Sequence, residues 1–161
     1  MGFNISNQRY VKVIRGTTLS HAVSGTPQTI DWSAGVKNSN GMWEGVTNPS
    51  RLTANRPGWY SVKGYVSFAA NATGDRELRI IKNGAAAAIV GRASVKSATL
   101  ITALQVHARV YLNVGDYVQL VANQTSTAAL DMTATAAEEC PSFSMCLELP
   151  EAGSSGAFER D

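Results

Sequence analysis

Residues 58–68 read GWYSVKGYVSF, and this stretch decides the fold because apolar and polar side chains alternate along it. Successive side chains of a β-strand point to opposite faces of the sheet. Apart from Gly64, the even-numbered residues from Tyr60 to Phe68 are apolar and predict a core-facing side. The odd-numbered residues from Ser61 to Ser67 predict an open, mostly polar side.

The same two-residue period recurs along the chain. Asn83-Gly84 lies between residues 77–82 and 85–90, and this pair accepts the positive φ of a tight turn, which predicts a hairpin. The break at Val114-Gly115-Asp116 separates two more such segments. Further strands are predicted at residues 10–14, 17–23, 77–82, 85–90, 104–112, 117–122 and 143–149. Many short strands with turns between them predict an all-β sandwich or barrel.

Two segments are less regular. Residues 31–56 are rich in Gly, Asn, Ser and Pro, which predicts mostly loop. Residues 126–139 are the one candidate for a helix, because their alanines favour helix although their threonines do not. We predict an extended loop or strand there.

Length and composition narrow the class of protein. With 161 residues and 17.1 kDa, the chain fits one domain that can bury a continuous core. Only 16% of the residues are charged, so much of the surface is easily desolvated against another subunit, which favours an oligomer. The net charge of +2 argues against nucleic-acid binding. Without a secretion signal or a long apolar run, we expect a protein made in the cytoplasm that has no membrane partner.

Four segments in a fixed order carry a resemblance. They are PGWYSV at 57–62, LRIIKNG at 78–84, VYLNVGDYVQL at 110–120 and FSMCLEL at 143–149. Together they resemble the complement globular-head and tumour-necrosis-factor-like jelly rolls, over residues 17–150. The resemblance implies an all-β fold, a ten-strand antiparallel jelly-roll sandwich, that forms a compact homotrimer. Residues 1–16 would then be an N-terminal arm and residues 151–161 an acidic, flexible C-terminal tail.

In such a trimer, one sheet of each subunit faces the threefold axis. Carried over to this chain, the axis-facing side chains of the trimer interface would be Ser61, Lys63, Tyr65, Ser67, Gln105, His107, Arg109, Ser144, Cys146 and Glu148. These are outward-facing residues of the alternating segments.

Without a signal peptide or a collagen-like stalk, the chain resembles the bacteriophage versions of this domain more than the secreted ones. That resemblance implies a structural virion protein on the capsid surface, either a trimeric capsid decoration (cement) protein or a head fibre. Its partners would be sister copies and the major capsid protein or another virion protein. The alternative is the receptor- or glycan-binding tip of a tail fibre, which would contact a host surface glycan.

The first fifteen residues combine apolar side chains with three positive charges and no negative one. One hypothesis is that this arm anchors the domain on the capsid, and the alternative is an edge strand with a frayed end. The anchoring residues would be Phe3, Ile5, Arg9, Tyr10, Lys12 and Ile14.

Catalytic residues are not evident. His21 and His107 are the only histidines, and a Ser-His-Asp arrangement could be drawn from them with Asp31 or Asp116. The chain has no Gly-x-Ser-x-Gly elbow, and His107 belongs to the outward set of its strand. We therefore predict that the protein is not an enzyme and needs no cofactor.

The candidates for metal binding are acidic residues, and the candidates for ligand binding are tryptophans. Calcium could be bound by the oxygens of Asp75, Glu77, Asp116 and Asp131, but no dense Asp-x-Asp-x-Asp loop occurs, so we predict no metal and interpret Asp75 and Asp116 as turn caps. Stacking on sugars makes three tryptophans candidates for ligand binding, although packing is the commoner role of such residues: Trp32, Trp43 and Trp59. Cys140 and Cys146 match no zinc or redox spacing and are predicted to be buried, reduced thiols.

Overall fold

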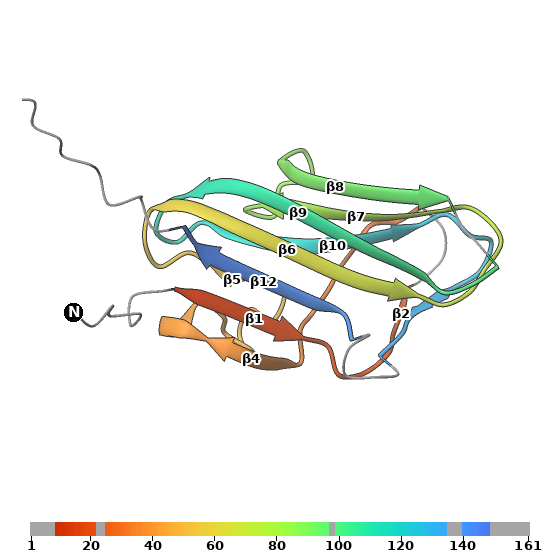
Figure 1. Cartoon of the computed structure of the whole chain (residues 1–161), viewed down its shortest axis with the longest axis horizontal. Coiled ribbons are helices and arrows are strands. Elements are labelled where there is room, and N and C mark those ends of the chain that lie inside the picture. The colour runs from red at the N-terminus through yellow and green to blue at the C-terminus, as the bar shows by residue number, and fades with distance from the viewer. Residues whose placement is uncertain (1–8, 22–24, 97–98, 135–139, 149–161) are drawn as a thin grey trace, which may run out of the picture.

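The computed structural model describes residues 9–21, 25–96, 99–134 and 140–148. Within these ranges, twelve strands form two antiparallel sheets, one of seven strands and one of five, which pack face to face (Figure 1). The predicted all-β antiparallel sandwich is therefore confirmed. Among the described residues, no helix is long and apolar enough to cross a bilayer.

The seven-stranded sheet is built around its two longest strands. In spatial order its path is β2 (Leu19–His21), β11 (Leu130–Met132), β6 (Gly58–Phe68), β12 (Ser142–Leu147), β1 (Tyr10–Ile14) and β4 (Ala34–Asn38), with β9 (Thr102–Leu112) on the other side of β6. β6 and β9 pair without a break from Gly58 opposite Leu112 to Phe68 opposite Thr102. The opposite side of β6 pairs with β12.

The five-stranded sheet contains the predicted hairpin. Its strands are β3 (Gln28–Thr29), β10 (Tyr117–Gln124), β7 (Asp75–Lys82) and β8 (Ile89–Lys96), with β5 (Leu52–Thr53) also paired to β10. Asn83 and Gly84 have φ values of 53° and 69°, as the Asn-Gly pair predicted. The second strand of the hairpin begins at Ile89 rather than Ala85, because Ala85–Ala88 closes another turn in which the Ala88 N–H donates to the Ala85 carbonyl.

The core lies between the sheets, where the alternating residues place it. Tyr60, Val62, Val66 and Phe68 are completely buried, and β9 alternates buried and exposed residues along its whole length. Gly64 occupies the remaining inward position of β6, where an added Cβ would lie 2.5 Å from Leu120 Cδ1 of the other sheet. Leu120 therefore fills the space that a side chain at residue 64 would take.

Several boundaries differ from the sequence interpretation. The strand predicted at residues 10–14 is confirmed as β1. It lies inside the seven-stranded sheet, with Val11 and Val13 completely buried, and not in the N-terminal arm to which these residues were also assigned. The segment 31–56, predicted as mostly loop, contains β4, the short 3-10 helix η2 (Ser39–Gly41) and β5. All five residues of β4 are exposed, so this strand has no alternation to reveal it. The described residues form twelve strands where the resemblance implied ten, and two of the twelve, β3 and β5, are only two residues long.

Some of the sequence predictions concern residues outside the described ranges. β11 lies within residues 126–139, in agreement with the extended conformation predicted there, while residues 135–139 lie outside the described ranges. The acidic tail at 151–161 and the first eight residues also lie outside them.

Arg76 is the largest completely buried side chain among the described residues, and the sequence interpretation missed it. Its guanidinium donates hydrogen bonds to the carbonyls of Asn71 (3.0 Å), Thr73 (3.0 Å) and Asp75 (3.1 Å). Burial lowers the pKa of Arg76, although the neighbouring Asp75 opposes that shift. An arginine can be buried here because the loop that precedes β7 wraps its carbonyls around it.

The backbone at Gly74 depends on glycine. Its φ is 73°, and a Cβ there would collide with the backbone carbonyl of Thr125. Thr125 cannot easily yield, because its N–H donates to the Asp75 carbonyl (3.0 Å) and its hydroxyl accepts the Asp75 N–H (2.7 Å). We expect Gly74→Ala to reduce the free energy of unfolding by about 2–3 kcal/mol in urea denaturation.

Gly115→Ala is the matched control, since Gly115 also has a positive φ, of 87°, but open space around the position of a Cβ. Gly115→Ala should reduce the free energy of unfolding by only about 1 kcal/mol, because the added Cβ makes the positive φ unfavourable but meets no neighbouring atom. Equal losses for the two variants would show that the contact with Thr125 is unimportant.

Candidate functional site on the exposed face of the seven-stranded sheet

The outward side chains of β1, β12, β6 and β9 form one continuous surface, which faces the viewer in Figure 1. We call it the open face. Its residues are Tyr10, Lys12, Ile14, Trp59, Ser61, Lys63, Tyr65, Ala103, Gln105, His107, Arg109, Tyr111, Ser142, Ser144, Cys146 and Glu148. All are exposed or half-buried, while the residues between them on β1, β6, β9 and β12 point into the core.

Strand register arranges these side chains in rows across the sheet. Directly opposed residues of an antiparallel pair lie on the same face, with Cβ atoms about 4.5–5.5 Å apart. The rows are Tyr10–Cys146–Ser61–Arg109, Lys12–Ser144–Lys63–His107 and Ile14–Ser142–Tyr65–Gln105. Residues that are far apart in the sequence are thereby brought side by side.

Most of the residues predicted to face a threefold axis lie on this surface. They are Ser61, Lys63, Tyr65, Gln105, His107, Arg109, Ser144, Cys146 and Glu148. Ser67 is the exception. Its exposed fraction is 1%, and its carbonyl accepts a hydrogen bond from the Thr133 N–H (2.8 Å), so the chain after β11 runs beside it. The role of the other residues in contacts between copies stays a prediction.

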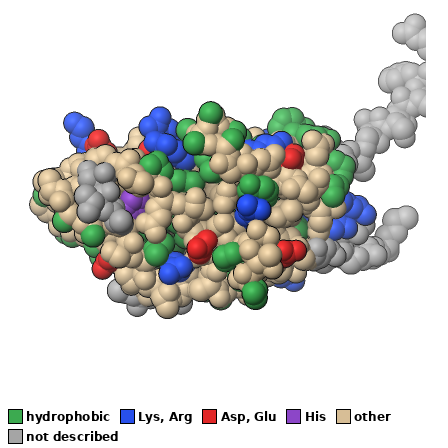
Figure 2. Space-filling model, turned by 180° about the vertical axis from the view of Figure 1, so that it is seen from behind, with side chains coloured by type: hydrophobic (Ala, Val, Ile, Leu, Met, Phe, Trp, Pro, Cys, Tyr) green, Lys and Arg blue, Asp and Glu red, His purple; other side chains and the backbone are tan. Residues whose placement is uncertain are grey.

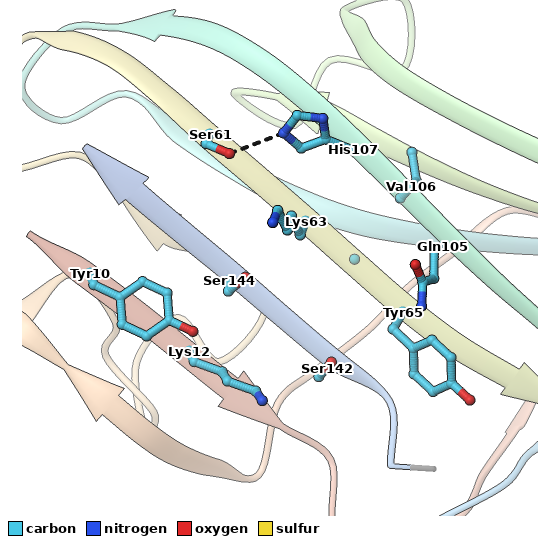
Figure 3. Close-up of a pocket in the computed structure, with 11 residues that line it drawn as sticks. Tyr10, Lys12, Ser61, Lys63, Tyr65, Gln105, Val106, His107, Ser142 and Ser144 are labelled. Atoms are coloured by element: carbon cyan, nitrogen blue, oxygen red, sulfur yellow. Dashed lines mark hydrogen bonds between the residues drawn. The ribbon is translucent and has the colours of Figure 1, made fainter. Parts of the chain in front are cut away.

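A groove of about 740 Å³ crosses the open face. It is lined by Tyr10, Lys12, Ser61, Lys63, Gly64, Tyr65, Gln105, Val106, His107, Ser142 and Ser144. Figure 3 shows the two serines of β12 in the middle, with long side chains of β1 on one side and of β6 and β9 on the other. The groove exists because β12 contributes only small residues here. No carboxylate lines it.

Strand β1 supplies one wall of the groove, which the sequence interpretation did not foresee. Tyr10, Lys12 and Ile14 were assigned to a capsid-anchoring arm, but they belong to the open face. The strand predicted at residues 10–14 is therefore correct, and its alternation with Val11 and Val13 is typical of a sheet strand rather than of an arm. Of the remaining anchoring candidates, Arg9 precedes β1 directly, and Phe3 and Ile5 lie outside the described residues.

The histidines have different environments. His107 Nε2 lies 3.0 Å from Ser61 Oγ on the open face, within hydrogen-bond distance. His21 is buried, and its Nε2 is 3.0 Å from the Ala122 carbonyl. The Asp116 carboxylate is bound in the turn before β10, and the residue opposite His107 on β6 is Lys63 rather than an acid.

The tryptophans divide into packing and exposed residues. Trp32 is buried and stacks on Phe143 with ring centroids 5.8 Å apart, so it is a core residue rather than part of a ligand site. Trp43 packs against the core and donates its indole N–H to the Pro49 carbonyl (3.0 Å). Trp59, 45% exposed at the end of the open face, is the most accessible of the three tryptophans, while Trp43 is half-buried.

Trp59 belongs to a small cluster. The Arg109 guanidinium lies 4.4 Å from the centroid of the Trp59 ring and forms an ion pair with Glu148 at 2.6 Å. Tyr111 packs edge-on against Trp59, with centroids 5.7 Å apart. The cluster combines an aromatic surface with a charged hydrogen-bonding pair.

The acidic residues considered for calcium are separated. Among the described residues, no group of three or more His, Cys, Asp or Glu side chains is placed to hold a metal ion. Asp116 instead holds the turn before β10. Its carboxylate pairs with Lys82 Nζ (2.8 Å) and accepts hydrogen bonds from the Asn113 N–H (2.9 Å) and the Asn83 amide (2.8 Å). The bonds to Lys82, Asn113 and Asn83 hold the pKa of Asp116 far below its usual range.

Glu77 is neutralised on the exposed side of the other sheet. Its carboxylate is nearly buried and pairs with Arg79 (2.5 Å) and with Arg92. Burial alone would raise the pKa of Glu77, but the hydrogen bonds and positive charges of the two arginines outweigh it, so that the pKa is lowered.

Figure 2, seen from behind, shows a mostly neutral polar surface on which charged groups are scattered.

Comparisons with known proteins identify the fold. No protein-family model and no curated protein matches the sequence. Among solved structures, crystal structures of murine APRIL at pH 5.0 and pH 8.0 align with TM-scores of 0.65 and 0.64 at 10% identity, over 88% of this chain and 100% of theirs. The globular domain of zebrafish complement 1qA protein aligns with a TM-score of 0.56 at 15% identity, over 89% of this chain and 99% of that one.

The chain has a TNF/C1q-like jelly-roll fold. At these identities the likeness concerns the backbone arrangement. The expected jelly roll is therefore confirmed, and the open face corresponds to one outer surface of this sandwich.

The Asp116 turn makes a pH-dependent contribution to stability. Since the pKa of Asp116 is lower in the folded protein than its ordinary value of 3.8, the contribution is complete above that value and is lost as the pH falls toward the folded-state pKa. We expect Asp116→Asn to reduce the free energy of unfolding by about 2 kcal/mol at pH 7 and by less at pH 3. Asp31→Asn, at an exposed acid, should change it little. An Asp116→Asn deficit that is the same at both pH values would contradict this assignment.

Proposed function

We propose that the chain is a non-catalytic structural protein that assembles into a homotrimer through the open face. The observation that carries this proposal is the open face itself, a continuous surface across four strands with few charges beyond Lys12, Lys63, Arg109 and Glu148. The jelly-roll fold and the resemblance of its sequence segments to trimeric domains support the same arrangement. The uncharged side chains of this face are cheap to desolvate when copies pack together, and Lys12 and Lys63 would need partners from a neighbouring copy.

Exposed apolar side chains at both edges of the sheet support a ring of copies. Leu100 and Ile101, just before β9, are 73% and 55% exposed, and Val36 on β4 is 58% exposed. β9 and β4 are opposite edges of the sheet in this region. A threefold ring uses two different surfaces of each copy, so that apolar residues at separate places can all be covered.

Such a trimer would serve as a capsid decoration protein or a head fibre, located on the surface of a phage capsid and assembled in the host cytoplasm. The low content of charged residues and the resemblance to phage jelly rolls support this proposal. Its partner would be the major capsid protein or another virion protein. With Tyr10, Lys12 and Ile14 in the open face, anchoring would fall to the residues before β1, which include Phe3, Ile5 and Arg9.

The alternative function, a receptor- or glycan-binding tip of a tail fibre, is favoured by one observation. Trp59 is exposed and packs against Tyr111, and the guanidinium of Arg109, which pairs with Glu148, lies over its ring. An aromatic ring beside charged hydrogen-bonding groups can bind a sugar. Trp32 and Trp43 are excluded from this site by their packing.

Trimer formation can be tested at the centre of the open face. Ser144→Arg would place a long charged side chain on the floor of the groove, and Ser94→Arg makes the same change on the exposed side of β8 in the other sheet. In analytical ultracentrifugation at micromolar concentration, we expect the unaltered chain and Ser94→Arg at three times the 17.1 kDa protomer mass and Ser144→Arg as a monomer. A monomeric unaltered chain, or a trimeric Ser144→Arg, would refute assembly through this face.

Capsid attachment can be tested by truncation. The deletion should end at residue 8, because the Arg9 carbonyl accepts the Leu147 N–H (2.9 Å) and belongs to the sheet. We expect the truncated chain to remain folded and trimeric but to lose cosedimentation with capsids that lack this protein. Retained capsid binding would exclude the arm as anchor. Binding to host cells instead of capsids, abolished by Trp59→Ala, would favour the fibre-tip alternative.

A further inference from the structure

The middle row of the open face is rich in lysine. Lys12 and Lys63 flank Ser144, and His107 lies opposite Lys63. On the other side of Lys12, the directly opposed residue of β4 is Lys37. Like charges that face each other across strands destabilise a sheet. Lys37 and Lys12 oppose each other directly, and Lys63 lies two strands further along the same row, so these three lysines attract a compensating negative charge.

That compensation is missing from the described part of the chain. Its four ion pairs involve Arg79, Lys82, Arg92 and Arg109, and none involves a lysine of this row. The contrast is clearest on the open face itself, where Arg109 has Glu148 as a partner at 2.6 Å. The groove around the row contains no carboxylate.

The groove around these lysines offers the donors that an oxyanion requires. Neighbouring strands are about 4.8 Å apart, so that the backbones of Lys12 and Lys63 are separated by roughly 10 Å, with the Ser144 strand between them. Two flexible ammonium groups can close on a ligand from opposite sides, as their placement in Figure 3 indicates. Hydroxyls of Ser142, Ser144 and Tyr10 add neutral donors along the groove.

We propose that the groove of the open face binds a small multivalent oxyanion, which Lys12 and Lys63 hold from the two sides above Ser144. The ligand class consists of molecules with two or more phosphate, sulfate or carboxylate groups, because such a molecule can place one group at each ammonium, whereas a single group requires both side chains to bend over the Ser144 strand. The site is made by one protomer, and this inference does not depend on trimer formation. If the trimer forms through the open face, three such grooves surround its axis.

Calorimetric titration of the full chain with inorganic tripolyphosphate tests the site, with citrate as the carboxylate counterpart. We expect saturable binding of tripolyphosphate in a background of sodium chloride. Lys12→Gln combined with Lys63→Gln should weaken it at least about tenfold, since each lysine supplies a charge-assisted hydrogen bond. The matched control, Lys96→Gln with Arg56→Gln, removes the same net charge from exposed positions outside the groove and should bind as tightly as the unaltered chain.

Each outcome decides the proposal. Equal weakening in both double variants would show that only the net charge of the protein matters, which contradicts the proposed site. The absence of binding by the unaltered chain would also refute the site. Sedimentation of the same samples separates this inference from the trimer. A trimer that binds no oxyanion, but is lost when Lys12 and Lys63 are replaced, would show that carboxylates of a second copy neutralise the row. A monomer that binds tripolyphosphate through these lysines would support the groove and refute the trimer.

Discussion

The structure depends on strand β6, which pairs with β12 on one side and with β9 on the other over the same residues. Lys63 is held opposite Ser144 on β12 and opposite His107 on β9, so that a single register determines which side chains of three strands share a face. A slip by one residue would turn Lys63 into the core and Val62 into solvent. An unpaired ammonium between the sheets would cost several kcal/mol, and this cost selects the observed register. The core and the open face are therefore two results of one constraint.

Small residues then shape what the two faces can do. Gly64 lets Leu120 of the other sheet approach β6 on the core side. On the outer side, Ser142 and Ser144 lie low between Tyr10 and Lys12 on β1 and the long side chains of β6, which opens the groove. A flat strand of larger residues at β12 would fill this space. Side-chain size at a few positions thus converts a plain sheet surface into one that can receive a ligand or another copy.

Charge is distributed unevenly between the parts of the molecule. Glu77 neutralises two arginines on the five-stranded sheet, and Asp116 is satisfied by Lys82 and two further donors in its turn. The lysines of the middle row have no comparable partner among the described residues. The open face is therefore a place where a further molecule, an oxyanion or a sister copy, would supply partners for these lysines.

The sequence by itself determined the class of fold, because a two-residue period indicates which side of a strand is buried even when its neighbouring strands are unknown. It also separated the outward set that includes Ser61, Lys63 and His107 from the core. Only the tertiary structure decided which outward residues share a surface: Ser67 is covered by the segment after β11, and Lys12 joins the groove from a segment that was interpreted as an arm. Strand order and register bring residues together across the sheet, and these depend on long-range pairing that a local pattern does not encode. For the same reason, the burial of Arg76 and the exposure of Trp59 followed only from the folded chain.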